Sequence, residues 1–136
     1  MLQASPTGRH FALEATQATI ELNASVHQAA ESLRQEVHAL VGQAQAAAGT
    51  LGLALRGGGT HVAQFWNERV LSPTDRAQVL DQRFGFLPKR FSTYGMHVHV
   101  GMPDAESAVR GANVLQAHTP LLIALSAASP LRSEGH

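Results

Sequence analysis

The chain has 136 residues, with 10 basic and 10 acidic side chains, 8 histidines and no cysteine. This length fits one domain, and balanced charge with a pI near 7.1 excludes the basic footprint of a nucleic-acid or anionic-membrane binder. Without cysteine there is no disulfide, thiolate zinc site or cysteine nucleophile. The longest apolar stretch, 121–128, is too short to span a bilayer. Because the N-terminus shows no signal-peptide pattern, we expect a cytoplasmic protein.

The first third of the chain predicts an irregular segment, one strand and one long helix. Residues 1–13 show no clear period and are expected to form an irregular N-terminal segment. Apolar and polar residues alternate over 15–22, which predicts a half-buried strand. Ser25 and Gln28 have the spacing of a helix capping box. Apolar residues at helical spacing follow, so the helix should end near Gly49.

The middle of the chain predicts a short strand, a loop and a second helix. The apolar run 51–56 is expected to be a strand that stops at the glycines 57–59. Residues 60–70 are expected to form a loop. The sequence Ser-Pro-Thr-Asp at 72–75 is typical of a helix start with proline in the first turn, and Pro88 should end or kink that helix.

The last part of the chain predicts one more strand and two helices. Residues 94–102 alternate again, Asp104 is expected to cap a helix, and Pro120 to open a final apolar helix. The order of elements indicates an α+β fold with a partial antiparallel sheet and helices on one face. Apolar residues make up 44% of the chain but aromatics only 5%. A core with so few large side chains favours a homo-oligomer, or a fold completed by sequence outside this chain.

The pair His97 and His99 is the first candidate for chemistry. On a strand, side chains two residues apart share a face and lie about 7 Å apart. Two imidazoles on one face make a natural metal or phosphate site. The alternative is a half-exposed pair on a polar face.

Two further features could bind ligands. Glu21 is a carboxylate in the middle of a predicted strand, where it could hold a hard cation such as Mg²⁺ or simply face water. The glycines 57–59, followed by Thr60 and His61, permit positive φ and close backbone approach, so their amides could cradle an anion. The alternative is a flexible turn, and the lack of a following Lys-Ser/Thr excludes a P-loop.

These motifs also occur in an order that resembles a known family. Thr-Ile-Glu-Leu at 19–22 precedes a long helix, Gly-Gly-Gly-Thr-His at 57–61, Gly-Met-His-Val-His-Val-Gly at 95–101 and Leu-Ser-Ala-Ala-Ser-Pro at 125–130. The order resembles the carboxylate–amine ligases related to glutamate–cysteine ligase, the bacterial type 2 group. The histidine segment is the most specific piece, and the resemblance covers 15–130.

The resemblance implies a glutamine-synthetase-like catalytic fold whose antiparallel sheet holds ATP and Mg²⁺ or Mn²⁺. The implied reaction phosphorylates a glutamate-like carboxylate to an acyl phosphate, from which an amine displaces phosphate. Both substrates would be small molecules, and no nucleic acid or membrane is expected as a partner. The implied roles are metal ligand for Glu21 and His97, catalytic residue for His97, and cofactor binding for Gly58, Gly59, Thr60, His61 and His99.

The chain departs from the family pattern in ways that leave the function open. The family's opening strand carries Gly-x-Glu-x-Glu, and 1–13 contains nothing like it. Family members are also much longer, so 1–136 is expected to be a single, partial ligase catalytic domain. One alternative is a catalytically incomplete remnant that acts as a binding or oligomerisation module. Another is a metal-binding protein that uses Glu21, His97 and His99.

Overall fold

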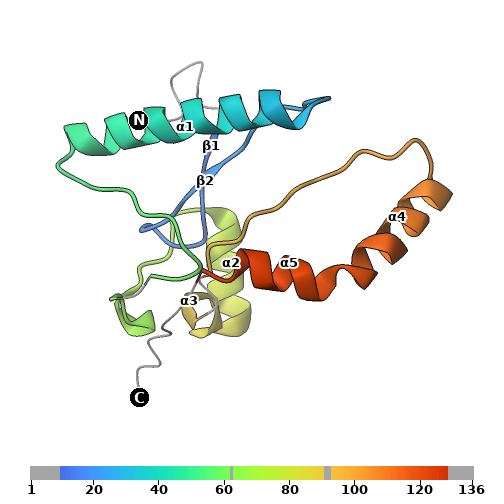
Figure 1. The fold of residues 1–136 in the computed structure, drawn as a ribbon. Coiled ribbons are helices and arrows are strands. Elements are labelled where there is room, and N and C mark those ends of the chain that lie inside the picture. The colour runs from blue at the N-terminus through green and yellow to red at the C-terminus, as the bar shows by residue number, and fades with distance from the viewer. Residues whose placement is uncertain (1–9, 62, 91–92, 129–136) are drawn as a thin grey trace. The chain divides into compact units, whose positions relative to one another are not determined.

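The computed structural model describes residues 10–61, 63–90 and 93–128 (Figure 1). The chain divides into two compact units: of the described residues, the first unit holds 10–57 and 64–90 and the second the rest. Helices and a small antiparallel sheet confirm the α+β class. In chain order the elements are β1 (Phe11–Leu13), β2 (Ile20–Leu22), α1 (Ala30–Thr50), the 3₁₀ helix η3 (Trp66–Glu68), α2 (Asp75–Phe84), α3 (Leu87–Arg90), α4 (Ala105–Ala117) and α5 (Thr119–Ser126).

Strands β1 and β2 form the sheet of the first unit. They pair antiparallel, with Phe11 opposite Leu22 and Leu13 opposite Ile20. The prediction of an irregular segment over 1–13 is therefore wrong at its end, because 11–13 finds a partner strand; residues 1–9 lie outside the described part.

The strand predicted over 15–22 is real only over 20–22. Its first residues turn away and pair with the segment that precedes α2. The Gln17 amide donates to the Val70 carbonyl at 2.9 Å, and the Ser72 amide donates to the Ala15 carbonyl at 2.9 Å. The alternating pattern thus covers two different pairings, one with β1 and one with 70–72.

Helix α1 begins later than its sequence predicts. Its N-cap is Ala29, which gives no side-chain hydrogen bond. The predicted cap, Ser25, fails because its hydroxyl instead donates to Glu36 at 2.8 Å. The predicted end near Gly49 is confirmed within one residue, and the buried side chains follow a narrow stripe at i, i+4 and i+8: Leu40, Ala44 and Ala48.

The predicted strand over 51–56 is absent from the structure. Its first residues are used to end α1, since the amides of Leu51 and Leu53 both donate to the Ala48 carbonyl. Gly52 has φ of 70°, a left-handed conformation that favours glycine. The rest of the run has no ladder partner among the described residues, so its apolar pattern does not become a strand.

Helix α2 starts at a cap and stops at a glycine. Thr74 is its N-cap, and the Thr74 hydroxyl accepts from the amide of the buried Ala77 at 3.2 Å. The helix ends at Gly85, with φ of 57°. The predicted break is therefore earlier than Pro88, which lies inside the first turn of α3, where a missing amide proton costs nothing.

The second unit contains the two predicted C-terminal helices. Asp104 caps α4 by accepting from the Ser107 amide at 2.7 Å, which lowers the pKa of Asp104, and Pro120 stands at the start of α5. Both helix starts confirm the prediction. The strand predicted over 94–102 does not form, because this extended segment has no ladder partner in the described chain (Figure 1).

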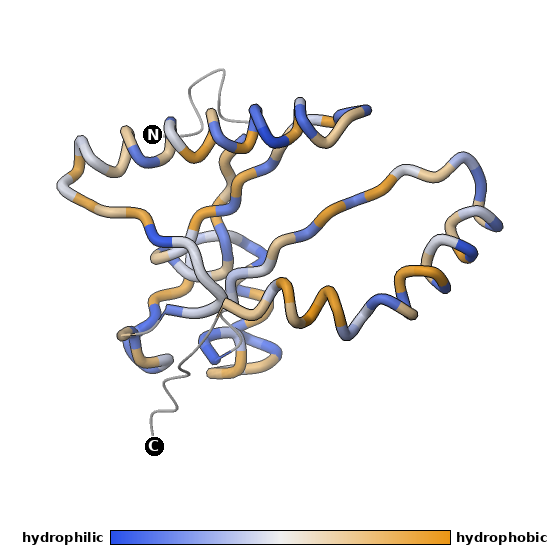
Figure 2. Tube along the Cα trace, viewed as in Figure 1, coloured by the Kyte–Doolittle hydropathy of each residue, from blue (hydrophilic) through white to orange (hydrophobic). Residues whose placement is uncertain are grey.

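Few apolar side chains are buried. Within the described ranges the buried apolar residues are three from α1 and Ala77. Helix α5 is hydrophobic along most of its length yet exposed, with Leu125 at 76% (Figure 2). No helix in this part of the chain has the length and apolar character needed to cross a membrane.

Candidate functional site

Three of the motifs singled out by the sequence meet at Gly59 in the second unit. The Gly59 amide donates to the Ala128 carbonyl at 3.2 Å. The Tyr94 amide donates to the Gly59 carbonyl at 2.7 Å. The backbone of this one residue thus joins the glycine loop to the start of the histidine segment and to the end of the Ser-Ala-Ala motif.

The glycine loop is shaped by these bonds and not by left-handed backbone. Among the described glycines, φ is positive at Gly52 and Gly85 alone, so the positive φ expected at 57–59 is not used. A Cβ added at Gly58 would lie 3.8 Å from the Ala128 carbonyl, an ordinary contact. The His61 ring turns back on its own loop, because its Nδ1 accepts from the Ala63 amide at 3.3 Å, and Thr60 is half-buried.

The structure brings His97 and His99 together. Their ring centroids lie 6.4 Å apart with the planes at 62°, and both side chains are exposed. Gly95 makes room for the first ring, since a Cβ there would lie 3.1 Å from His97 Nε2. The same-side placement follows from the two-residue spacing, even though no strand forms.

Glu21 lies in the first unit, at the centre of β2 opposite Ala12. Its side chain is exposed and makes no ion pair or hydrogen bond within the described residues. It lines a small open hollow with residues of β1, its flank and α2: Leu13, Glu14, Ala15, Thr74, Arg76, Ala77 and Leu80. No group of three or more histidine or acidic side chains in the described chain is placed to hold a metal ion.

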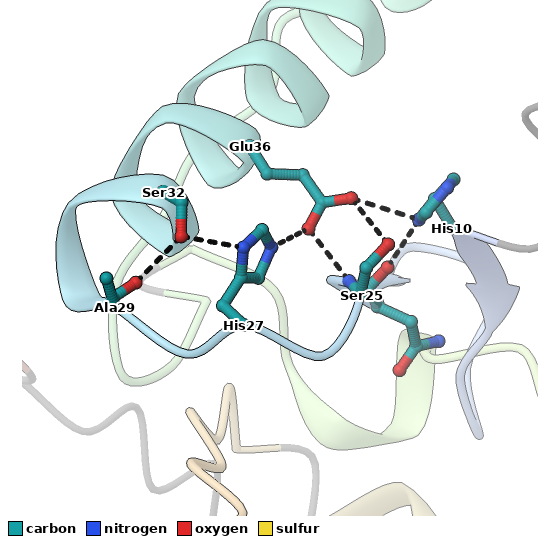
Figure 3. A network of polar contacts seen from close by, with 7 residues as sticks. His10, Ser25, His27, Ala29, Ser32 and Glu36 are labelled. Carbon is teal, nitrogen blue, oxygen red and sulfur yellow. Dashed lines mark hydrogen bonds and ion pairs between the residues drawn. The ribbon is translucent and has the colours of Figure 1, made fainter.

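A polar network around Glu36 was not foreseen from the sequence (Figure 3). The Glu36 carboxylate accepts from the Ser25 amide and hydroxyl, each at 2.8 Å, and contacts His27 Nε2 at 2.6 Å. The hydrogen bonds from His27 and Ser25 lower the pKa of Glu36 to about 2. The carboxylate is therefore ionised at neutral pH and fastens the 25–27 loop to α1.

The same network reaches both ends of that loop. The Ser32 hydroxyl donates to the Ala29 carbonyl at 2.9 Å and lies 3.0 Å from His27 Nδ1. On the other side, His10 Nδ1 donates to the Asn23 carbonyl at 2.8 Å (Figure 3). The sequence signal was Ser25, which looked like a helix cap but serves as a partner of a carboxylate eleven residues on.

Comparison with known proteins now decides the family. A model of glutamate–cysteine ligase family 2 matches residues 2–136, almost the whole chain. The chain belongs to this family. The resemblance inferred from the motif order is thereby confirmed.

Curated relatives agree with the family assignment. A protein of Laribacter hongkongensis is 39% identical over 117 residues, 86% of this chain and 31% of its own length. A protein of Bordetella avium is 39% identical over 127 residues, 93% of this chain and 32% of its own. Both are named "Putative glutamate--cysteine ligase 2". The chain thus spans about a third of the length of these relatives.

No solved structure matches the chain. The glutamine-synthetase-like fold that the resemblance implies therefore stays a prediction, and the sheet of the described residues has two strands. The motifs that meet at Gly59 are those of a chain in glutamate–cysteine ligase family 2.

Proposed function

We propose that this chain supplies part of the active site of an ATP-dependent carboxylate–amine ligase of the glutamate–cysteine ligase type. The observation that carries the proposal is the meeting at Gly59 of three of the four segments on which the family resemblance rests. Backbone hydrogen bonds there hold together residues that are 35 and 69 positions apart in the sequence. Such convergence is expected where several loops must contact one ligand.

The proposed reaction has two balanced steps. A carboxylate oxygen of a glutamate-like substrate attacks the γ-phosphorus of ATP, so that the P–O bond to the β-phosphate breaks and ADP leaves. The amine nitrogen of the second substrate then attacks the acyl carbon, the C–O bond to phosphate breaks, and the nitrogen loses a proton. Positioning and charge stabilisation carry most of the catalysis in such phosphoryl transfers.

Each unit separately offers ligand types that the divalent ion of this chemistry uses, and no group of three or more such side chains in the described residues is placed to hold the ion. The free Glu21 carboxylate offers the oxygen that Mg²⁺ prefers, and the exposed imidazoles of His97 and His99 suit Mn²⁺ better. When bound, the ion would neutralise phosphate charge. In this proposal His97 would contact the ion or the transferred phosphate and His99 would support it. The loop of Gly58, Gly59, Thr60 and His61 would approach the nucleotide through its backbone.

Product formation by the 136-residue chain tests the proposal. The chain is given ATP, glutamate and a panel of amines with Mg²⁺ or Mn²⁺, and ADP release and amide product are measured. We expect both to depend on amine and metal and to fall in His97→Ala. His38→Ala, the same change on an exposed face of α1, is the matched control. A folded chain that forms no product with any amine and binds no ATP in the presence of either metal ion would overturn the proposal.

The second candidate function is a binding or oligomerisation module, favoured by the exposed apolar side chains of α5. Leu125 is 76% exposed and Ile123 63%. Light scattering on the purified chain would show self-association that weakens in Leu125→Ser. Val26→Ser, at an isolated exposed valine of the first unit, is the control. A monomer at all concentrations would exclude oligomerisation.

A further inference from the structure

Arg69 is a buried cation without a counter-ion among the described residues. The residue directly follows η3 and is 8% exposed. Its Nη1 donates to the Lys89 carbonyl at 2.6 Å, and its Nε is buried without a hydrogen-bond partner. An ionised group removed from water is costly unless it is paired and hydrogen-bonded. The structure therefore leaves a charge to be balanced at this point.

The orientation of the guanidinium leaves the edge formed by Nε and Nη2 without a hydrogen-bond partner among the described residues. The bond to Lys89 uses Nη1, whereas Nε and Nη2 make no hydrogen bond within the described chain. Parallel N–H bonds from adjacent guanidinium nitrogens match the two oxygens of a carboxylate or phosphate. The donors of Arg69 that lack partners are thus those suited to an oxyanion.

The surroundings of Arg69 are also positive. Lys89 and Arg90 lie together at the end of α3, and the Arg90 guanidinium carbon lies 5.8 Å from the centre of the Trp66 ring. The one acidic residue of η3 and α3, Glu68, accepts from the Phe65 amide at 3.0 Å. Cations therefore outnumber carboxylates on the elements around Arg69.

We propose that Arg69 is the recognition residue of an oxyanion site at the contact between η3 and α3, which takes a phosphate or carboxylate group. The competing explanation is that Arg69 only caps the last carbonyls of α3. That role accounts for Nη1 but not for the buried, unpartnered Nε. The proposed site uses none of the residues assigned to the ligase reaction and does not depend on turnover.

The single tryptophan of the chain makes the site directly measurable. Because Trp66 contacts Arg90 and lies 5.6 Å from Phe86, its fluorescence reports on this contact. The chain is titrated with inorganic phosphate, with glutamate and with chloride at equal ionic strength. We expect a saturable change with phosphate, glutamate or both, and none with chloride. Saturation by one alone identifies the group as phosphate or carboxylate.

Two variants separate recognition from general charge. Arg69→Gln keeps a donor for the Lys89 carbonyl but removes the guanidinium, and we expect it to weaken oxyanion binding at least about tenfold. Arg83→Gln, the same change at an exposed position of α2, should bind as the wild type does. Equal weakening in both variants, or unchanged binding in Arg69→Gln, would overturn the proposal.

A second measurement covers the case in which Arg69→Gln does not fold. In the wild-type chain, the Nε–H resonance of Arg69 and the indole N–H resonance of Trp66 are followed during the phosphate and glutamate titrations. We expect both resonances to move along one shared saturation curve. Resonances that stay in place, or that move equally with chloride, would show that no oxyanion site exists there.

Discussion

Replacing Gly95 with alanine tests whether the position of the His97 ring matters for ligand binding. A Cβ at residue 95 would lie 3.1 Å from His97 Nε2 and 3.6 Å from its Cδ2. The ring must then retreat or rotate away from its rotamer minimum, which costs about 0.5–1.5 kcal/mol. If the observed ring position is the one that binds, ligand affinity should fall about two- to twelvefold.

Calorimetric titration with Mn²⁺ measures this loss, and the imidazole resonances of His97 measure the displacement directly. Gly101→Ala is the matched control, because a Cβ at that end of the segment meets nothing within 4 Å. We expect Gly101→Ala to retain the wild-type affinity and spectrum. Identical His97 resonances and Mn²⁺ affinities in Gly95→Ala and Gly101→Ala would refute the reasoning.

Three further predictions concern stability. Thr74→Ala should lower the unfolding free energy by about 1 kcal/mol in urea, because the Ala77 amide loses its cap, whereas Thr74→Ser should keep it. Glu36→Gln should make the melting temperature depend less on pH in the acidic range. The lowered pKa of Glu36 gives stability that is present above the ordinary value of 4.5 and lost as pH falls through about 2. Gly42→Ala in α1 should stabilise the chain by about 1 kcal/mol. Gly52→Ala should destabilise it, since φ there is 70°; equal effects of the two glycine changes would contradict this.

Helix caps were predictable from the sequence because their hydrogen bonds are local. Asp104 accepts from an amide three residues ahead, and Pro120 needs only its own ring geometry to start a helix. Ser25 shows the limit of such reasoning. Its spacing is that of a cap, but Glu36 competes for the same hydroxyl from a later turn of the helix.

Strands were harder to predict because a strand needs a partner that its own pattern does not name. The run 51–56 and the segment 94–102 have strand-like composition but no ladder partner in the described chain, whereas 11–13 has little pattern and pairs well. An alternating sequence specifies which side chains share a face of the strand, but not which other segment pairs with that strand.

In the candidate site, too, the local features could be predicted from the sequence and the tertiary contacts could not. The closeness of His97 and His99 follows from a spacing of two residues, and the family follows from motif order. The meeting of Tyr94, Gly59 and Ala128 and the burial of Arg69 are tertiary facts that no local pattern encodes.

The exposed alternating run in the histidine segment has a consequence for the colloidal behaviour of the protein. Met96, Val98 and Val100 are 86%, 67% and 65% exposed beside backbone that forms no ladder in the described structure. Such a run is a template for strand addition by a neighbouring molecule. Electrostatic repulsion between molecules is weakest near the pI of about 7.1. Turbidity in concentrated samples should therefore peak near neutral pH and decline on either side.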